Sequence, residues 1–266
     1  MRGELPLILG AASLLAGCGT LPGGGHWGED ATPLPGWGRL GRAAAHAALD
    51  PGTWAPAAGA VVLGAGGFDH RISNWAVDHT PIFSSNDSAD SASSTLRGFL
   101  HGAAIATTLA TPSGSAVKDW VPAKAEGFAV EVASWEATTL SVDALKNATG
   151  RTRPNRVNDQ SFPSSNASDA FDFATQTSRN LDSIQMPGAL RTGLQVGAYT
   201  LAGTSAWARV EAGAHFPSDV LAGAALGHFL GSFFHDAFLG LKEGEGPGIE
   251  IVPEGKGAML VLDFRF

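Results

Sequence analysis

The stretch ARVEAGAHFPSDVLAG, residues 208–223, joins the end of one predicted helix to the start of the next. Pro217 occupies a position typical of the first residue of a helix, where its missing N–H is not needed. Asp219 then lies in the first helical turn, four residues after His215. At this spacing its carboxylate can accept the Nδ1–H of His215 and leave Nε2 free for nucleophilic attack. The alternative is an acidic residue that complements the helix dipole beside a loop histidine.

On either side of this stretch, long segments rich in Ala, Gly and Leu alternate with loops rich in Pro, Gly, Ser and Asn, among them TPIFSSNDSADS, TPSGS, RTRPNRVNDQSFPSS and QMPG. A short helix is predicted near residues 38–49, and the C-terminal segments IEIV and AMLVLDFRF predict a short β-hairpin. We therefore expect an all-α fold, a helical bundle with a C-terminal hairpin. The predicted helices of the bundle lie near residues 54–68, 93–111, 116–148, 166–182, 188–210 and 217–240.

Length and composition narrow the class of protein. The 266 residues suit one domain, and a hydrophobic content of 44% with 16% charged residues excludes a disordered chain or a coiled coil. The net charge of −8 argues against a nucleic-acid partner. A single cysteine excludes a disulfide framework and a cysteine-based zinc site. The apolar segment Val220–Phe234 is shorter than the roughly 20 residues of a membrane span, so we expect core helices of a soluble bundle.

The single cysteine, Cys18, follows a short apolar run. Residues 5–15 are too few to span a membrane and are typical of a secretory signal. The sequence LAGC that ends at Cys18 resembles a bacterial lipobox, which implies removal of residues 1–17 and attachment of lipid to Cys18. An ordinary signal peptide with an incidental cysteine is the alternative. The lipobox implies a membrane-anchored lipoprotein of the cell envelope that faces the periplasm, and the lack of an aspartate after Cys18 favours the outer membrane.

Two further clusters precede residues 208–223. In the first, six residues separate Lys146 from Arg153-Pro154, so that a lysine and an arginine can converge on one anion. The alternative is a pair of cations that only caps a helix. The second cluster, SFPSSNAS at 161–168, begins a predicted helix whose free N–H groups can bind an anion. Its alternative is a simple N-cap.

Chance does not explain these clusters. In a chain of this composition, Lys-x6-Arg-Pro is expected roughly 0.013 times and Arg-x5-His-x3-Asp roughly 0.02 times. Both patterns occur, in this order, with a Pro-Ser helix start between them. Together they resemble the type 2 phosphatidic acid phosphatase and vanadium haloperoxidase superfamily over roughly residues 54–240.

The resemblance implies an all-helical bundle with the three clusters around a phosphate pocket. His215 would be the nucleophile that forms a phosphohistidine, and Asp219 would orient it. No metal or cofactor is implied, because three cations can stabilise the transferred group, and vanadate would bind as a phosphate mimic. By the family pattern the phosphate is bound by Lys146, Arg153, Arg209, Ser164 and the backbone N–H of Ser165.

With this resemblance the chain divides into four segments. They are a signal peptide (1–17), a Gly/Pro-rich tether (18–53), a helical phosphatase-like domain (54–240) and a C-terminal hairpin tail (241–266).

One position departs from the family pattern. The family reads Pro-Ser-Gly-His, whereas this chain reads PSSN at 163–166, so that Asn166 replaces the histidine that serves as general acid. An amide has no titratable proton, although it can donate a hydrogen bond. The replacement of glycine by Ser165 is also unfavourable if the loop requires a positive φ there.

Three functions follow from this departure. The first is a metal-independent phosphatase for phosphate monoesters or diphosphates, whose substrate is a phosphorylated small molecule or, given the envelope location, a lipid. Its leaving group would be assisted by water, by Asn166, or by one of His70, His79 and His101. The second is a lipid-anchored pseudoenzyme that binds a phosphorylated ligand. The third, a vanadate-dependent haloperoxidase, is disfavoured because the missing histidine serves there too.

Overall fold

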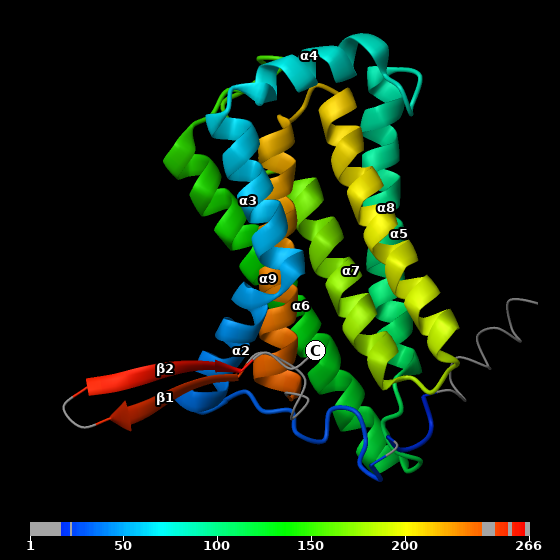
Figure 1. The fold of residues 1–266 in the computed structure, drawn as a ribbon. Helices are drawn as coiled ribbons and strands as arrows, with labels where there is room; N and C mark the ends of the chain where they lie inside the picture. Colours follow the sequence, from blue (N-terminus) through cyan, green and yellow to red (C-terminus); the bar gives the residue numbers. More distant parts are fainter. Residues whose placement is uncertain (1–16, 22, 241–247, 255–256, 264–266) are drawn as a thin grey trace, which may run out of the picture.

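The computed structural model describes residues 17–21, 23–240, 248–254 and 257–263 (Figure 1). Most of the predicted signal peptide and part of the C-terminal tail lie outside these residues. The described part contains eight α-helices, and a π-helical turn η1 (His235–Leu239) extends the last of them. The helices are α2 (Trp37–Leu49), α3 (Pro51–Ala65), α4 (Phe68–His79), α5 (Asn86–Ala110), α6 (Val117–Thr149), α7 (Ser165–Ser183), α8 (Gly188–Glu211) and α9 (Pro217–Phe234).

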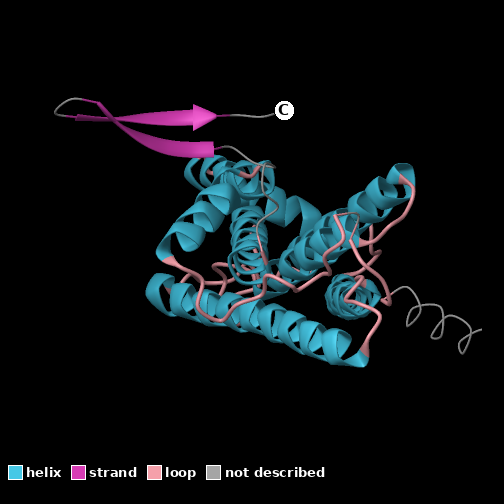
Figure 2. Ribbon diagram, turned by 90° about the horizontal axis from the view of Figure 1, so that it is seen from below, coloured by secondary structure: helices cyan, strands magenta, loops and turns pink. Residues whose placement is uncertain are grey.

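Helices α7 and α9 form the centre of the bundle. In Figure 1, α3 lies beside α9, α5 and α8 flank α7 on the right, and α4 crosses the top. Helix α6 runs obliquely behind them from the upper left to the lower right and contacts both α9 and α7. Figure 2 shows the same helices from below, packed together in a single bundle. The prediction of an all-helical domain is confirmed.

A row of glycines lets α9 approach α7 closely. Gly223, Gly227 and Gly231 recur every four residues and therefore lie on one face of α9. A Cβ at Gly223 would lie 2.7 Å from the carbonyl oxygen of Ser164, and one at Gly227 would overlap the carbonyl of Ser168. Because no side chain fits in this space, glycine at these positions fixes the spacing of the two central helices.

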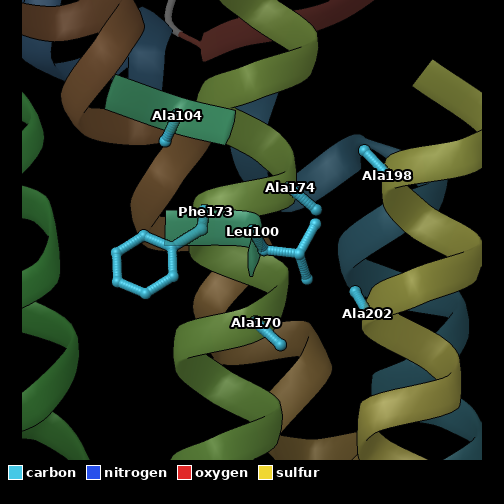
Figure 3. Close-up of a cluster of buried hydrophobic side chains, with 7 residues drawn as sticks. All are labelled: Leu100, Ala104, Ala170, Phe173, Ala174, Ala198 and Ala202. Atoms are coloured by element: carbon cyan, nitrogen blue, oxygen red, sulfur yellow. The ribbon is translucent and has the colours of Figure 1, made fainter. Parts of the chain in front are cut away.

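Small apolar side chains fill the space between α5, α7 and α8 (Figure 3). Alanines allow the three helices to pack closely, while one leucine and one phenylalanine supply most of the buried volume. The cluster consists of Leu100, Ala104, Ala170, Phe173, Ala174, Ala198 and Ala202.

The N-terminal half of the bundle differs from the prediction. Helix α4 was not predicted, and α5 begins at Asn86 rather than near residue 93. The segment expected to be a loop contains an N-cap, because the Ser85 side chain accepts a hydrogen bond from the backbone N–H of Ser88. The first turns of α5 are polar and largely exposed, so they show no apolar periodicity.

Part of the predicted tether packs onto the bundle. Trp27 is buried, and a Cβ at Gly127 of α6 would overlap its ring. Ala43 and Ala47 of α2 are fully buried, and α2 lies against α9. At the other end of the chain, strands β1 (Gly248–Glu254) and β2 (Gly257–Asp263) pair antiparallel. The turn between them, 255–256, lies outside the described residues, so the C-terminal hairpin stays a prediction.

Within the described ranges, none of the helices combines the length and the apolar character that crossing a membrane requires.

Candidate active site

The predicted cations and the predicted nucleophile come together at one end of the bundle. Lys146 lies in the last turn of α6, Arg153 in the loop before α7, Arg209 in the last turn of α8, and His215 just before α9. Arg153 and Arg209 line one cavity together with Ala214, the residue before His215, and Lys146 contacts Ser165 at the start of α7. The structure therefore assembles these four residues around one position.

Backbone hydrogen bonds fix the turn that carries the histidine. The N–H of His215 donates to the carbonyl of Arg209 at 3.2 Å. The N–H of Ser164 donates to the carbonyl of Asp219 at 3.1 Å, which ties the start of α7 to the start of α9. Gly213 has φ +65°, a conformation that strains residues with a side chain. The sharp reversal between α8 and α9 thus depends on glycine at this position.

The environment of His215 keeps its imidazole neutral. The residue is only 2% exposed, and its Nδ1 lies 2.6 Å from the carbonyl oxygen of Ser161. Burial is the main cause that lowers its pKa well below 6.5, and the charges of Arg153 and Arg209 lower it further. A neutral ring that donates from Nδ1 has its lone pair on Nε2, as a nucleophile requires.

The partner of His215 differs from the predicted one. Its Nδ1 lies 4.0 Å from Oδ2 of Asp219, too far for a hydrogen bond. Asp219 instead accepts hydrogen bonds from the hydroxyl of Ser161 at 2.6 Å and from the N–H of Phe216 at 2.8 Å. The capping of α9 holds this carboxylate at the helix start, so Asp219 contacts the residue that holds His215 rather than His215 itself.

Arg151, which lies between Lys146 and Arg153, was not predicted as a site residue. Its guanidinium donates to Asp219 at 2.6 Å and to Asp69 of α4 at 2.7 Å. It also donates to the hydroxyl of Ser218 at 2.8 Å. Asp69 in turn accepts from the N–H of Ser218 at 2.9 Å. No motif marks this arginine, because its partner Asp69 lies in a helix that the sequence did not predict.

Two of the cations have hydrogen-bond partners beside the site. Lys146 is largely buried and donates from Nζ to the hydroxyl of Ser165 at 2.5 Å. Burial lowers the pKa of Lys146, and the nearby charge of Arg153 lowers it further. Nε of Arg153 donates to the side chain of Asn158 at 2.8 Å, which steadies the loop.

Arg209 lies between His215 and a cavity at the surface of the bundle. Its Nη1 forms an ion pair with Asp90 of α5, whereas its Nε is buried without a hydrogen-bond partner among the described residues. A cavity of about 470 Å³ opens here and is lined by Arg153, Arg209 and Asp90 among others. An anion with several oxygen atoms would fit this pair of arginines.

Comparison with protein families agrees with this geometry. Residues 132–241, from the middle of α6 to just beyond η1, match the family model of the PAP2 superfamily. This match supports membership of the chain in the superfamily. All three sequence clusters lie within the matched residues, which confirms the predicted kinship with type 2 phosphatidic acid phosphatases. Comparisons with curated proteins and with solved structures found no match.

The second cluster, residues 161–168, has Ser165 and Asn166 where the family pattern has glycine and histidine. Ser164 caps α7, and its side chain accepts from the N–H of Ala167 at 3.4 Å. Ser165 is the first residue of α7 and does not have a positive φ, so the substitution of glycine there causes no backbone strain. Asn166 donates from Nδ2 to the hydroxyl of Ser93 at 3.1 Å, and its amide nitrogen therefore has a partner on α5.

The three histidines that could assist the leaving group, His70, His79 and His101, lie in different surroundings. His79 stacks on Trp75 of the same helix, and His101 stacks on Phe173 in the interior. His70 lies nearest, with its ring 4.8 Å from that of Phe216, the residue after His215. The cavity beside the arginines is not lined by any of the three.

Among the residues that the structure describes, no group of three or more His, Cys, Asp or Glu side chains is arranged to hold a metal ion.

Proposed function

We propose that this PAP2 protein hydrolyses phosphate monoesters or diphosphates, lipid-linked ones included, through a phosphohistidine on His215 without a metal. PAP2 membership supports phosphatase-type hydrolase chemistry in general. The observation that carries the specific proposal is a buried, neutral His215 beneath the charges of Lys146, Arg153 and Arg209. Together these residues supply a nucleophile and three donors for phosphate oxygens.

The first half of the reaction forms the covalent intermediate. The lone pair of Nε2 attacks phosphorus in line as the bond to the leaving oxygen breaks. Lys146, Arg153 and Arg209 donate to the equatorial oxygens, and the free N–H groups at the start of α7 add further donors. The leaving oxygen takes a proton from water, because Asn166 has no titratable proton to give.

The second half releases phosphate. A water molecule attacks phosphorus, the P–N bond breaks, and its electron pair returns to Nε2 of His215. The water loses its proton to solvent as inorganic phosphate departs. Asp219 acts as a positioning residue in both halves, since it holds Ser161, whose carbonyl fixes the imidazole.

A pseudoenzyme that binds a phosphorylated ligand is the second candidate. The observation that favours it is Asn166, whose amide donates to Ser93 where a PAP2 phosphatase has its general acid. Such a protein would keep the cations and bind phosphate or vanadate without turnover. The haloperoxidase alternative has no comparable support, because Asn166 removes the acid needed there as well.

We also propose that lipid attached to Cys18 anchors the protein to a bacterial envelope membrane, facing the periplasm and more specifically at the outer membrane. The support is the lipobox sequence together with the exposed position of Cys18.

The variant His215→Ala tests the mechanism. Turnover of 4-nitrophenyl phosphate should fall by about 10³-fold or more, and acid quenching should no longer trap a phosphoenzyme. The control His70→Ala removes the neighbouring histidine and should retain both signals. Undiminished turnover in His215→Ala would disprove the phosphohistidine. If the wild type shows no turnover yet binds phosphate at micromolar concentration, the protein is the pseudoenzyme.

A further inference from the structure

Two cavities adjoin at the end of the bundle where the arginines lie. The inner cavity is the one lined by Arg153 and Arg209. The outer cavity, of about 550 Å³, is lined by Ser73, Asn74 and Asp78 of α4 and by Pro154 of the loop before α7. The two cavities share Asn86, Asn155 and Ala212 as walls, so a ligand that fills one extends toward the other.

The in-line geometry of phosphoryl transfer directs the leaving group toward these cavities. The nucleophile and the leaving oxygen lie on opposite sides of phosphorus. His215 is almost completely buried, whereas Arg153 and Arg209 line the inner cavity. A phosphate held by these arginines and attacked from beneath by His215 must therefore point its ester oxygen outward, into the inner cavity and toward the outer one.

The walls of the outer cavity are suited to hydroxyl groups. Asn74 and Asp78 are four residues apart and lie on one face of α4, and Asn155 faces the same space. Amide and carboxylate groups together accept from and donate to alcohols. Ser73 also lines this cavity, and its fully buried Oγ has no hydrogen-bond partner within the described ranges. A buried hydroxyl without a partner is unfavourable, and a bound alcohol could satisfy it.

The same walls disfavour two other kinds of leaving group. Asp78 in the outer cavity would repel a second phosphate, and the described residues that line this cavity include no lysine or arginine to offset the repulsion. The apolar wall of the outer cavity is limited to Val77 and a few small residues, which leaves little surface to bury an acyl chain.

We propose that the outer cavity binds the leaving group, and that this group is a small, hydroxyl-rich alcohol rather than an acyl lipid or a second phosphate. The substrate class is then the phosphate monoesters of polyols and sugars. This inference rests on the proposed phosphatase function, and its test must separate failure of the cavity from failure of catalysis.

The test compares substrates that share a leaving oxygen of the alkyl type. With the full-length protein in detergent, kcat/KM is measured for glycerol phosphate, hexyl phosphate, phosphoethanolamine and dispersed phosphatidic acid, with 4-nitrophenyl phosphate as the reference. The wild type should prefer glycerol phosphate over hexyl phosphate by about tenfold, the worth of one or two hydrogen bonds. A preference for hexyl phosphate, for phosphatidic acid or, measured alongside them, for an alkyl diphosphate would overturn the proposal, as would a preference for phosphoethanolamine.

Variants connect the preference to the cavity. Asn74→Leu and, independently, Asp78→Leu should each remove most of the preference for glycerol phosphate over hexyl phosphate, by raising KM for glycerol phosphate while its kcat is largely retained. Thr200→Leu, an exposed position on α8 outside both cavities, is the matched control and should change neither. An unchanged preference in both cavity variants would contradict the assignment.

Binding of a ligand in the outer cavity can be measured even if the protein has no turnover. If the wild type hydrolyses none of these esters, the proposed function fails. Calorimetric titration with the same phosphates then decides the inference on its own. Tighter binding of glycerol phosphate than of hexyl phosphate, lost in Asn74→Leu, supports it, and the reverse order overturns it.

Discussion

The carbonyl oxygen of Ser161 lies 2.6 Å from Nδ1 of His215. A carbonyl can only accept a hydrogen bond, so Nδ1 carries the proton and the tautomer of the imidazole is fixed. The hydroxyl of Ser161 donates to Asp219 at 2.6 Å. One loop residue therefore joins the carboxylate to the histidine, and the position of the imidazole depends on the loop between α6 and α7.

We expect catalysis to persist at acidic pH. Burial and the charges of Arg153 and Arg209 lower the pKa of His215 well below 6.5, so the free enzyme keeps a neutral nucleophile until the pH falls below that range. The acid limb of kcat/KM should lie clearly below pH 6.5. Arg153→Gln should move it upward by removing one positive charge, whereas Arg156→Gln, an exposed arginine of the same loop, should not. An acid limb at or above pH 6.5 in the wild type would contradict the assignment.

The same lowered pKa predicts how stability depends on pH. Below pH 6.5 the unfolded chain binds a proton on His215 that the folded protein resists, so the free energy of unfolding should fall as pH decreases toward the folded pKa. This contribution is fully present above pH 6.5. His215→Gln should weaken the dependence in urea denaturation between pH 6.5 and 5, and an identical dependence in the variant would mean that other groups cause it.

Asn166→His should restore the missing general acid. If a histidine at this position reaches the leaving oxygen, turnover of alkyl phosphates should rise by about 10-fold or more. Turnover of aryl phosphates should change little, because their phenolate leaving group departs without a proton. Ser165→Gly is not needed for this gain, because Ser165 already has a helical conformation.

The control is Asn166→Ala, which removes the hydrogen bond to Ser93 without adding an acid. Equal rates for alkyl and aryl phosphates in the wild type, unchanged by Asn166→His, would show that another group supplies the proton.

Arg151→Met should destabilise the fold. The change leaves Asp69 and Asp219, both buried, without their cationic partner, a loss of about 3 kcal/mol in the free energy of unfolding. Urea denaturation measures this loss directly. Adding Asp69→Asn to Arg151→Met should recover part of the stability, because one unpaired charge is then removed. A single variant as stable as the wild type would show that the network contributes little.

Cys18→Ser should release the protein from the membrane fraction while its activity on a soluble phosphate is retained. Lipid on the cysteine is the predicted anchor, and the described helices give no candidate for a membrane span. Fractionation with a carbonate wash measures the release. A variant that stays membrane-bound after this wash would show that another part of the protein binds the membrane.

Local signals in the sequence determined the second half of the bundle and most of its site. Helices α6 to α9 begin and end within two residues of the prediction at most of their boundaries, because Pro217, the cap at Ser164 and the glycine that follows α6 act on neighbouring residues. The spacing from Lys146 to Arg153 and from Arg209 to His215 is likewise local. Each pair lies across the end of one helix, so the two residues are close in the sequence and also close in space. Their proximity could therefore be predicted.

Tertiary structure alone decided the partners of these residues. The bond from His215 to Ser161 spans 54 positions, and the bond from Ser218 to Asp69 spans 149. Helix α4, which supplies Asp69, has only 12 residues, and the side chains that it buries are polar or small (Asp69, Ser73 and Ala76), so apolar periodicity does not mark the face that packs on the bundle. The sequence shows which residues carry charge, but which carboxylate meets Arg151 depends on how the helices pack. Gly223 and Gly227 set that packing, because they let α9 approach α7 closely enough for the N-terminal ends of the two helices to form a hydrogen bond.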